Sequence, residues 1–370
     1  MSLSRRALLG LGVLGLSAVG TAGAVLFRDS PLLRGLLGDV TTLTGYAGGE
    51  KMAFIQDPHT VSGLKGFGLA LEAERAGSVE QVRDPGLLGT KPQFLWPSSS
   101  PLIELARKNA TVLRDQVIFN SPIVVYSWAP FAEGLVRAGI ATKQGDHYYG
   151  LDAKALIEAV LAHKAWRDLG QPDLYGRVRL IATDPNKSNS GFMFAGLAAN
   201  LMAGDVVAAD SLPAILPQLT QLSRSMGYKS DSSGKVFDDY IAGGPGADPL
   251  VVGYENQLIE WIIADPERWS RVTAAAGPAQ PAALYPTPTV YSAHPLLALV
   301  PQAIPLIDAL MSARLQTIAW RDHGFRGPLG AVGADADTDP AIKGRMPNQL
   351  TAILPMPDMT VMLRILDALA

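Results

Sequence analysis

Hydrophobic and polar positions form short apolar runs and longer amphipathic stretches along most of the chain. Apolar runs at 51–55, 118–128 and 177–184 predict buried strands, whereas 151–166 has the spacing of an amphipathic helix. Residues 249–263, "PLVVGYENQLIEWII", predict a strand that leads directly into a helix. Strands that alternate with helices in this way predict an α/β protein with mostly parallel sheets.

The N-terminus has the pattern of an export segment. Arg5 and Arg6 precede an uncharged run, rich in Gly, Ala and Leu, that reaches Phe27, and "SRRALLG" is close to the twin-arginine pattern. The small residues Ala22 to Ala24 offer a cleavage site, but the run is also long enough to span a bilayer as an anchor. Both outcomes stay open, and either places the rest of the chain outside the cytoplasm. A Gly/Leu-rich connector is expected over 28–50.

Composition excludes several classes of function. The 370 residues are 48% hydrophobic, which is enough to build a large core. With 31 Lys plus Arg against 34 Asp plus Glu, no basic surplus is available to bind nucleic acid. The absence of cysteine excludes disulfides, thiolate catalysis and cysteine zinc sites.

The histidines are scattered singly, so His294 and His323 are expected to be structural, and no metal site or cofactor is expected. Neither a Gly-x-Ser-x-Gly pentapeptide nor a phosphate-binding P-loop is present, which argues against an enzyme.

Small hydroxyl and amide residues cluster where three helices are expected to begin. Free backbone N–H groups and the positive end of the helix dipole favour an anion at such positions. Each cluster alone is typical of ordinary helix capping, but several that converge on one cleft would bind a small anion through neutral donors. The candidates are Ser78, Ser98, Ser99, Ser188, Asn189 and Ser190.

The order of the motifs resembles that of the type II periplasmic solute-binding proteins, especially the branch of molybdate- and tungstate-type binders. The motifs are "AGSVEQV", "FNSPIVV", "TDPNKSNSG", "VVGYENQ" and the return segment "AALYPTPTVYSAHPLLAL" followed by "LQTIAWRDHGF". The resemblance implies two α/β lobes joined by a hinge. It places 51–121 plus 261–326 in lobe one and 122–260 in lobe two, and it leaves 327–370 as a C-terminal extension.

The resemblance also implies a function for the candidate residues. Tyr254 joins the six candidates as a ligand contact, and Asn120 and Ser121 are candidates at the hinge or in the pocket. The expected protein is a monomer that captures an oxyanion or small carboxylate for a membrane permease and catalyses nothing. The alternative is a membrane-anchored sensor or interaction protein with the same fold, which an uncleaved N-terminus would suit.

Two features depart from the pattern of that family. Glu255 would repel an anion if it faced the cleft, and would favour a cationic or hydroxylated ligand; alternatively it pairs with Lys187 or Arg326, or caps its own helix. Asp57 and His59 stand in the predicted first loop, where the related binders tend to carry small hydroxyl residues. Both features weigh against a simple oxyanion site.

Overall fold

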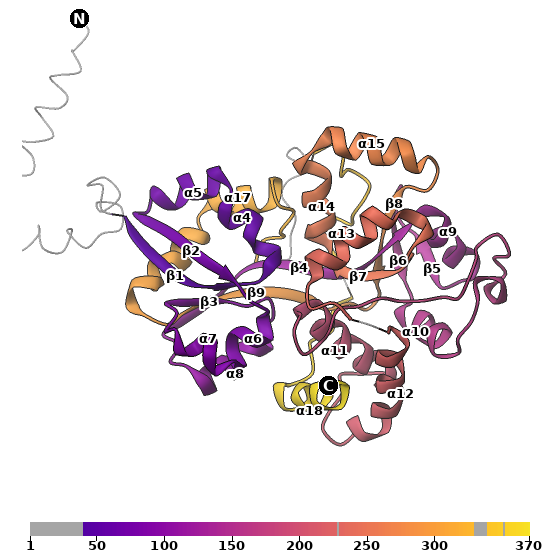
Figure 1. Cartoon of the computed structure of the whole chain (residues 1–370), viewed down its shortest axis with the longest axis horizontal. Coiled ribbons are helices and arrows are strands. Elements are labelled where there is room, and N and C mark those ends of the chain that lie inside the picture. Colours follow the sequence, from indigo (N-terminus) through magenta and orange to yellow (C-terminus); the bar gives the residue numbers. More distant parts are fainter. Residues whose placement is uncertain (1–39, 228, 329–338, 351) are drawn as a thin grey trace, which may run out of the picture.

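The computed structural model describes residues 40–227, 229–328, 339–350 and 352–370, which form two lobes side by side (Figure 1). The α/β class and the two-lobed architecture predicted from the sequence are confirmed. The predicted export segment lies outside the described residues. Within the described ranges, no helix has both the length and the apolar character needed to cross a membrane.

The first lobe is a sheet between two layers of helices. Its strands follow the order β2 (Leu69–Arg75), β1 (Thr41–Ala47), β3 (Phe94–Trp96) and β9 (Tyr291–Ala298). One face packs on α4 (Met52–Gln56), α5 (Pro58–Lys65), α16 (Ile304–Leu310) and α17 (Ala313–Arg321). The other face packs on α6 (Ser78–Arg83), α7 (Pro85–Gly89) and α8 (Pro101–Asn109).

The second lobe surrounds the end of the long strand β4 (Arg114–Trp128). Its other strands are β5 (Ala141–Lys143), β6 (Tyr148–Leu151), β7 (Val251–Tyr254) and β8 (Pro281–Pro286). Its helices are α9 (Ala129–Arg137), α10 (Ala153–Leu161), α11 (Asn189–Ala203), α12 (Leu212–Ser225), α13 (Ser233–Gly243), α14 (Glu255–Ala264), α15 (Pro266–Ala276) and α18 (Met359–Leu369). Nearly every residue of α11 is buried, as expected for a helix that is apolar all round.

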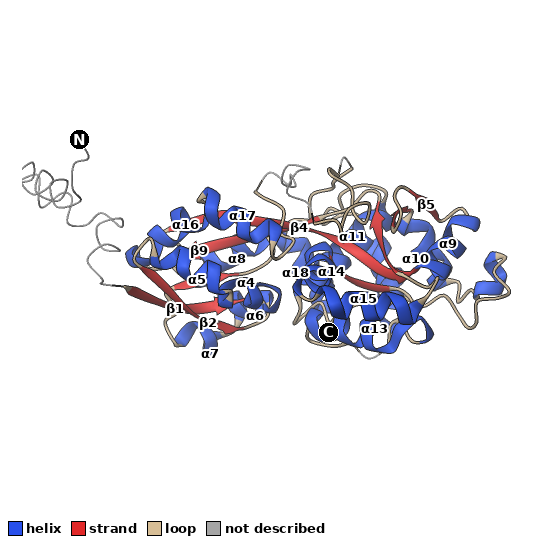
Figure 2. Ribbon diagram, turned by 90° about the horizontal axis from the view of Figure 1, so that it is seen from above, coloured by secondary structure: helices blue, strands red, loops and turns tan. Residues whose placement is uncertain are grey.

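Strand β4 joins the two lobes into one continuous sheet, and Figure 2 shows it running from one lobe into the other. Residues up to Pro122 pair with β9, whereas residues from Ile123 onward pair with β7 and β8. The chain returns between β8 and β9. A bridge between Asn120 and Arg326 lies beside the same crossing, so the hinge consists of adjacent backbone segments.

The first predicted strand differs from the structure. Thr41–Ala47, which the sequence analysis placed in the connector, is the first strand, and Met52–Gln56 is helical. A five-residue apolar run fits a buried helix turn as well as a strand, and the alternation in "TTLTGYA" is masked by its threonines. Residues 177–184 lie beside β7 but make only isolated bridges, at Arg177 and Ile181.

The predicted lobe boundaries also differ from the structure. Residues 261–286 were expected in lobe one, but Pro281–Pro286 pairs with β4 and β6 in the second lobe. The chain has to complete that strand before it can return, so the crossing falls at 287–290. The C-terminal extension packs chiefly on the second lobe, where α18 lies against α11 and α12, and α18 also contacts α8 of the first lobe.

Candidate functional site

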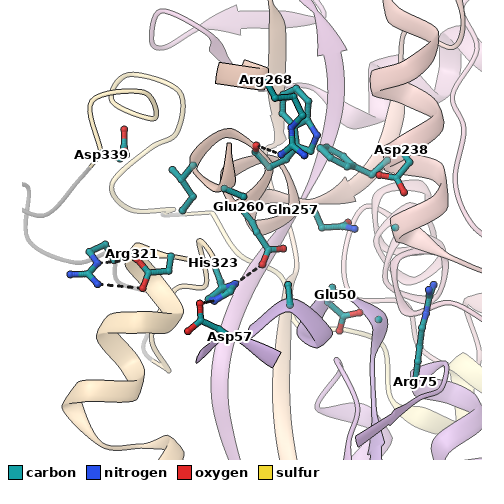
Figure 3. Close-up of a pocket in the computed structure, with 18 residues that line it drawn as sticks. Glu50, Asp57, Arg75, Asp238, Gln257, Glu260, Arg268, Arg321, His323 and Asp339 are labelled. Atoms are coloured by element: carbon teal, nitrogen blue, oxygen red, sulfur yellow. Dashed lines mark hydrogen bonds and ion pairs between the residues drawn. The ribbon is translucent and has the colours of Figure 1, made fainter. Parts of the chain in front are cut away.

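A cleft of about 870 Å³ separates the two lobes, and we call it the outer cleft. The first lobe contributes the loop after β1, the start of α5, the end of β2 and the end of α17. The second lobe contributes α13, α14 and the start of α15 (Figure 3). A volume of this size suits a small organic solute.

The outer cleft is acidic. Six carboxylates and three guanidinium groups of the described residues line it: Glu50, Asp57, Asp238, Glu260, Asp322 and Asp339 against Arg75, Arg268 and Arg321. Arg321 pairs with Asp322 at 3.0 Å, and Glu50 pairs with the buried Lys51 at 2.6 Å. Without those two pairs, four carboxylates face two guanidinium groups. The potential of the cleft therefore favours a cation.

Both remaining guanidinium groups have partners in the protein. Arg75 donates a hydrogen bond to Ser232 Oγ across the cleft, which ties the two lobes together at one end. Arg268 lies over the Trp261 ring at 4.6 Å and donates to the Trp261 carbonyl at 2.8 Å. These contacts reduce the attraction that either arginine would offer to an anionic solute.

His323 lies between two carboxylates in the wall of the outer cleft. Its Nδ1 is 2.5 Å from Glu260 Oε1 and its Nε2 is 3.6 Å from Asp57 Oδ2, and Figure 3 shows the two acids on opposite sides of the ring. Asp57 also caps α5, since it accepts from the backbone N–H groups of His59 and Thr60. His59 itself points into solvent, with its side chain 71% exposed. Of the two first-loop candidates, only Asp57 reaches the cleft.

A second, much smaller space of about 40 Å³ lies deeper between the lobes, and we call it the inner cavity. Four predicted ligand contacts line it: Ser78, Ser188, Asn189 and Tyr254. The structure thus brings together helix N-termini from both lobes, as the resemblance implied. The volume accommodates no more than a few water molecules.

Hydrogen bonds inside the protein already connect these donors. Ser98 donates its backbone N–H to Ser78 Oγ at 3.0 Å, and Asn189 Nδ2 donates to the Ser98 carbonyl at 2.8 Å and to Tyr254 Oη at 3.0 Å. Burial and the nearby Glu50 carboxylate raise the pKa of Tyr254 well above its ordinary value, so its hydroxyl stays protonated. The buried Asn189 Oδ1 accepts no hydrogen bond from the described residues.

An ion pair that the sequence analysis missed stands beside the inner cavity. Lys51 Nζ lies 2.6 Å from Glu50 Oε1 and 2.6 Å from Ser98 Oγ, and Ser98 donates its hydroxyl to Glu50. Burial alone would raise the pKa of Glu50, but the Lys51 charge and these hydrogen bonds hold it at about 2. Burial and Lys51 lower the pKa of His294 well below its ordinary value, so its imidazole is neutral.

The other predicted contacts lie away from both spaces. Ser99 Oγ is 3.2 Å from the sulfur of Met193, and Ser190 Oγ is 2.7 Å from Thr183 Oγ1. Asn120 donates to the carbonyls of Gly327 and Pro328, whereas Ser121 Oγ accepts from the N–H of Asn256. Asn120 and Ser121 therefore lie at the crossing between the lobes, and the roles expected for them stay predictions.

Glu255 is held by Arg326, one of the alternatives left open by the sequence. Arg326 Nε is 2.6 Å from Glu255 Oε1, and Nη2 is 2.7 Å from Oε2. Tyr285 donates its hydroxyl to the same carboxylate at 2.7 Å. The carboxylate is buried and its acceptors are satisfied, so it does not line the outer cleft or the inner cavity.

The sequence analysis did not name several residues that line the outer cleft, although each comes after the carboxyl end of a strand. Glu50 lies in the turn after β1, and Glu260 and Trp261 lie on the helix that continues from β7. Ligands of open α/β sheets bind at the carboxyl ends of strands, so a correct first strand would have pointed to Glu50.

His323 was expected to be structural but lines the outer cleft. Among the described residues, no group of three His, Asp or Glu side chains is placed to hold a metal ion.

Solved structures share this fold. A periplasmic thiamin binding protein matches with a TM-score of 0.59 and 12% identity, over 89% of this chain and 95% of that chain. A ferric binding protein from Campylobacter jejuni matches with a TM-score of 0.56 and 9% identity, over 88% and 96%. An apo ferric ion-binding protein A from Pasteurella haemolytica matches with 0.55 and 12%, over 89% and 95%. The chain therefore has the two-lobed fold of periplasmic binding proteins.

Sequence comparison adds no closer relation. No family model matches the chain, and no curated protein matches it. The narrower resemblance to molybdate- and tungstate-type binders stays a prediction.

Proposed function

We propose that this protein captures a small, positively charged organic solute in the outer cleft, outside the cytoplasm, and delivers it to a membrane permease. The observation that carries the proposal is the acidic lining of an interlobe cleft of about 870 Å³. The N-terminal export pattern and the fold support the location and the delivery role. Binding proteins of this kind work by closing two lobes on the solute and need no catalytic group.

The acidic walls come from both lobes, so a bound cation would hold the lobes together. Asp57 belongs to the first lobe, whereas Asp238 and Glu260 belong to the second. Trp261, with Arg268 over its ring, forms part of the same wall. Charge from opposite walls makes lobe closure favourable only when the cation is present.

The titles of the similar structures name thiamin and ferric ion as ligands, but at 9–12% identity they indicate only the fold. The cargo class is therefore inferred from the cleft itself. The oxyanion predicted from the sequence is the second candidate, favoured by the convergence of Ser78, Ser188, Asn189 and Tyr254 on the inner cavity.

Calorimetric titration separates the two cargo classes. The chain is titrated with thiamin and spermidine as organic cations, and with sulfate and molybdate as oxyanions. We expect binding of at least one cation, weakened about 10-fold by Glu260→Gln, which corresponds to about 1.4 kcal/mol. The matched control is Glu267→Gln on α15, whose side chain is 91% exposed and outside the cleft. Binding of an oxyanion without binding of any cation would overturn the proposal.

A further inference from the structure

Glu50 stands at the boundary between the inner cavity and the outer cleft, and it lines both. Its hydrogen bonds and its ion pair with the described residues all involve Oε1, which contacts Lys51 and Ser98 and lies 3.5 Å from the neutral ring of His294. The second oxygen, Oε2, accepts no hydrogen bond from that part of the chain. One oxygen of the carboxylate is therefore fixed by the protein, and the other is available to a ligand.

The groups around Oε1 are those that an oxyanion would need. The Ser98 hydroxyl and the Lys51 ammonium are strong donors to a negative charge, and both serve Glu50. Asn189 and Tyr254 enclose the inner cavity from the opposite lobe. With only about 40 Å³ left between them, a tetrahedral oxyanion would have to displace the carboxylate.

We propose that Glu50 is a built-in anion that occupies the oxyanion position of the inner cavity and selects cationic cargo through its free Oε2. This inference deepens the proposed function, on which its cationic half rests. The carboxylate fills the position that an oxyanion would take, and the donors committed to it leave an incoming oxyanion without hydrogen bonds. The free Oε2 remains as an acceptor for an ammonium or other cationic group that enters from the outer cleft.

The test measures sulfate binding by calorimetry in the wild-type chain and in Glu50→Gln. The amide is uncharged, so the Lys51 ammonium loses its counter-ion, and sulfate can displace the side chain toward the outer cleft and take its place beside Lys51 and Ser98. We expect the variant to bind sulfate at least 10-fold more tightly than the wild type. Asp238→Asn is the matched control: it removes a cleft carboxylate that does not line the inner cavity, and no gain of that size is expected.

Two results would overturn the inference. One is wild-type binding of sulfate as tight as that of Glu50→Gln. The other is a folded Glu50→Gln variant, judged by circular dichroism, that gains no affinity for sulfate. A buried pair with a purely structural role would give the second result, because its removal would change stability and leave ligand preference unchanged.

A charge-balanced variant covers the case in which Glu50→Gln does not fold. Glu50→Gln combined with Lys51→Met removes both charges of the buried pair, so no uncompensated charge remains. We expect this double variant to lose at least 10-fold in affinity for the cation that the wild type binds, thiamin or spermidine. Unchanged cation affinity would show that Glu50 does not select the cargo.

The sulfate titration and the cation titration together distinguish failure of this inference from failure of the proposed function. If the wild type binds neither thiamin nor spermidine, the proposed function fails, and the sulfate comparison alone decides the role of Glu50. If the wild type binds a cation and the double variant binds it equally well, the proposed function stands and the inference fails.

Discussion

The buried pair of Arg326 and Glu255 gives the sharpest prediction about the hinge. The two side chains are 0% and 1% exposed, and two N–H groups of the guanidinium contact the two carboxylate oxygens. Arg326 follows the first-lobe helix α17, whereas Glu255 begins the second-lobe helix α14. The perturbations are Arg326→Met, Glu255→Gln and the combination of both.

Loss of one partner leaves the other as an uncompensated buried charge, which costs about 3–5 kcal/mol in proteins. Arg326 also donates to the carbonyls of Pro347 at 2.7 Å and Asn348 at 3.1 Å. Pro347 is half-buried and Asn348 is exposed, so water can replace the lost donor at these two carbonyls and the loss adds little. We therefore expect Arg326→Met and Glu255→Gln each to lower the free energy of unfolding by about 3–5 kcal/mol.

Urea unfolding, followed by tryptophan fluorescence, measures each free energy. Because the two side chains contact each other, the double variant should cost at least about 2 kcal/mol less than the sum of the single variants. Lys108→Ala breaks an exposed pair with Glu104 and should change stability by less than about 1 kcal/mol. Single costs below 1 kcal/mol, or costs that simply add, would refute the claim that this pair stabilises the hinge as a unit.

Three further predictions concern the C-terminal helix, pH and lobe closure. Ile365→Ala removes a fully buried side chain of α18 and should cost about 2–5 kcal/mol in urea unfolding, whereas the exposed Asp367→Ala should be nearly neutral. The pKa of Glu50 is about 2 in the folded chain against an ordinary 4.5, so its charge stabilises the fold above pH 4.5. That contribution should fall between pH 4.5 and 2, and the stability difference between wild type and Glu50→Gln should change over this window only. A Cβ at Gly77 would collide with the Lys187 carbonyl of the opposite lobe, so Gly77→Val should hold the lobes apart, which a larger radius of gyration in X-ray scattering would show.

The parts of the fold that were predicted from the sequence depend on local patterns. The apolar run at 118–128 lies within β4, and "VVGYENQ" forms the expected strand that leads into a helix. The pairing of Glu255 with Arg326 was one of three alternatives, because charge and position alone could not choose among them. The choice depends on the chain returning past the hinge, a contact between residues 71 positions apart in the sequence.

The errors about the first strand and the first loop have one origin. Once 51–55 was taken for the first strand, the first loop became 56–60, and the ligand search settled on Asp57 and His59. The actual first loop is "GGEK", residues 48–51, which follows Thr41–Ala47. Because the first strand was placed one element too late, the sequence analysis named His59 as a candidate for the cleft and overlooked Glu50.

Four of the predicted contacts, Ser78, Ser188, Asn189 and Tyr254, line the inner cavity, and the sequence analysis interpreted their chemistry as the site of a bound oxyanion. Buried donors that converge on one site need acceptors, since unpaired buried donors are costly, and a negative charge is the strongest acceptor. That charge can come from the chain itself, and the carboxylate of Glu50 lies within hydrogen-bonding distance of Ser98 and Lys51. A donor cluster thus predicts an anion at its centre, whereas the origin of that anion depends on which residue the neighbouring strand places there. In this protein the turn after β1 supplies Glu50. The donors that would bind an oxyanion hold its carboxylate instead, and its second oxygen is left to favour a cation.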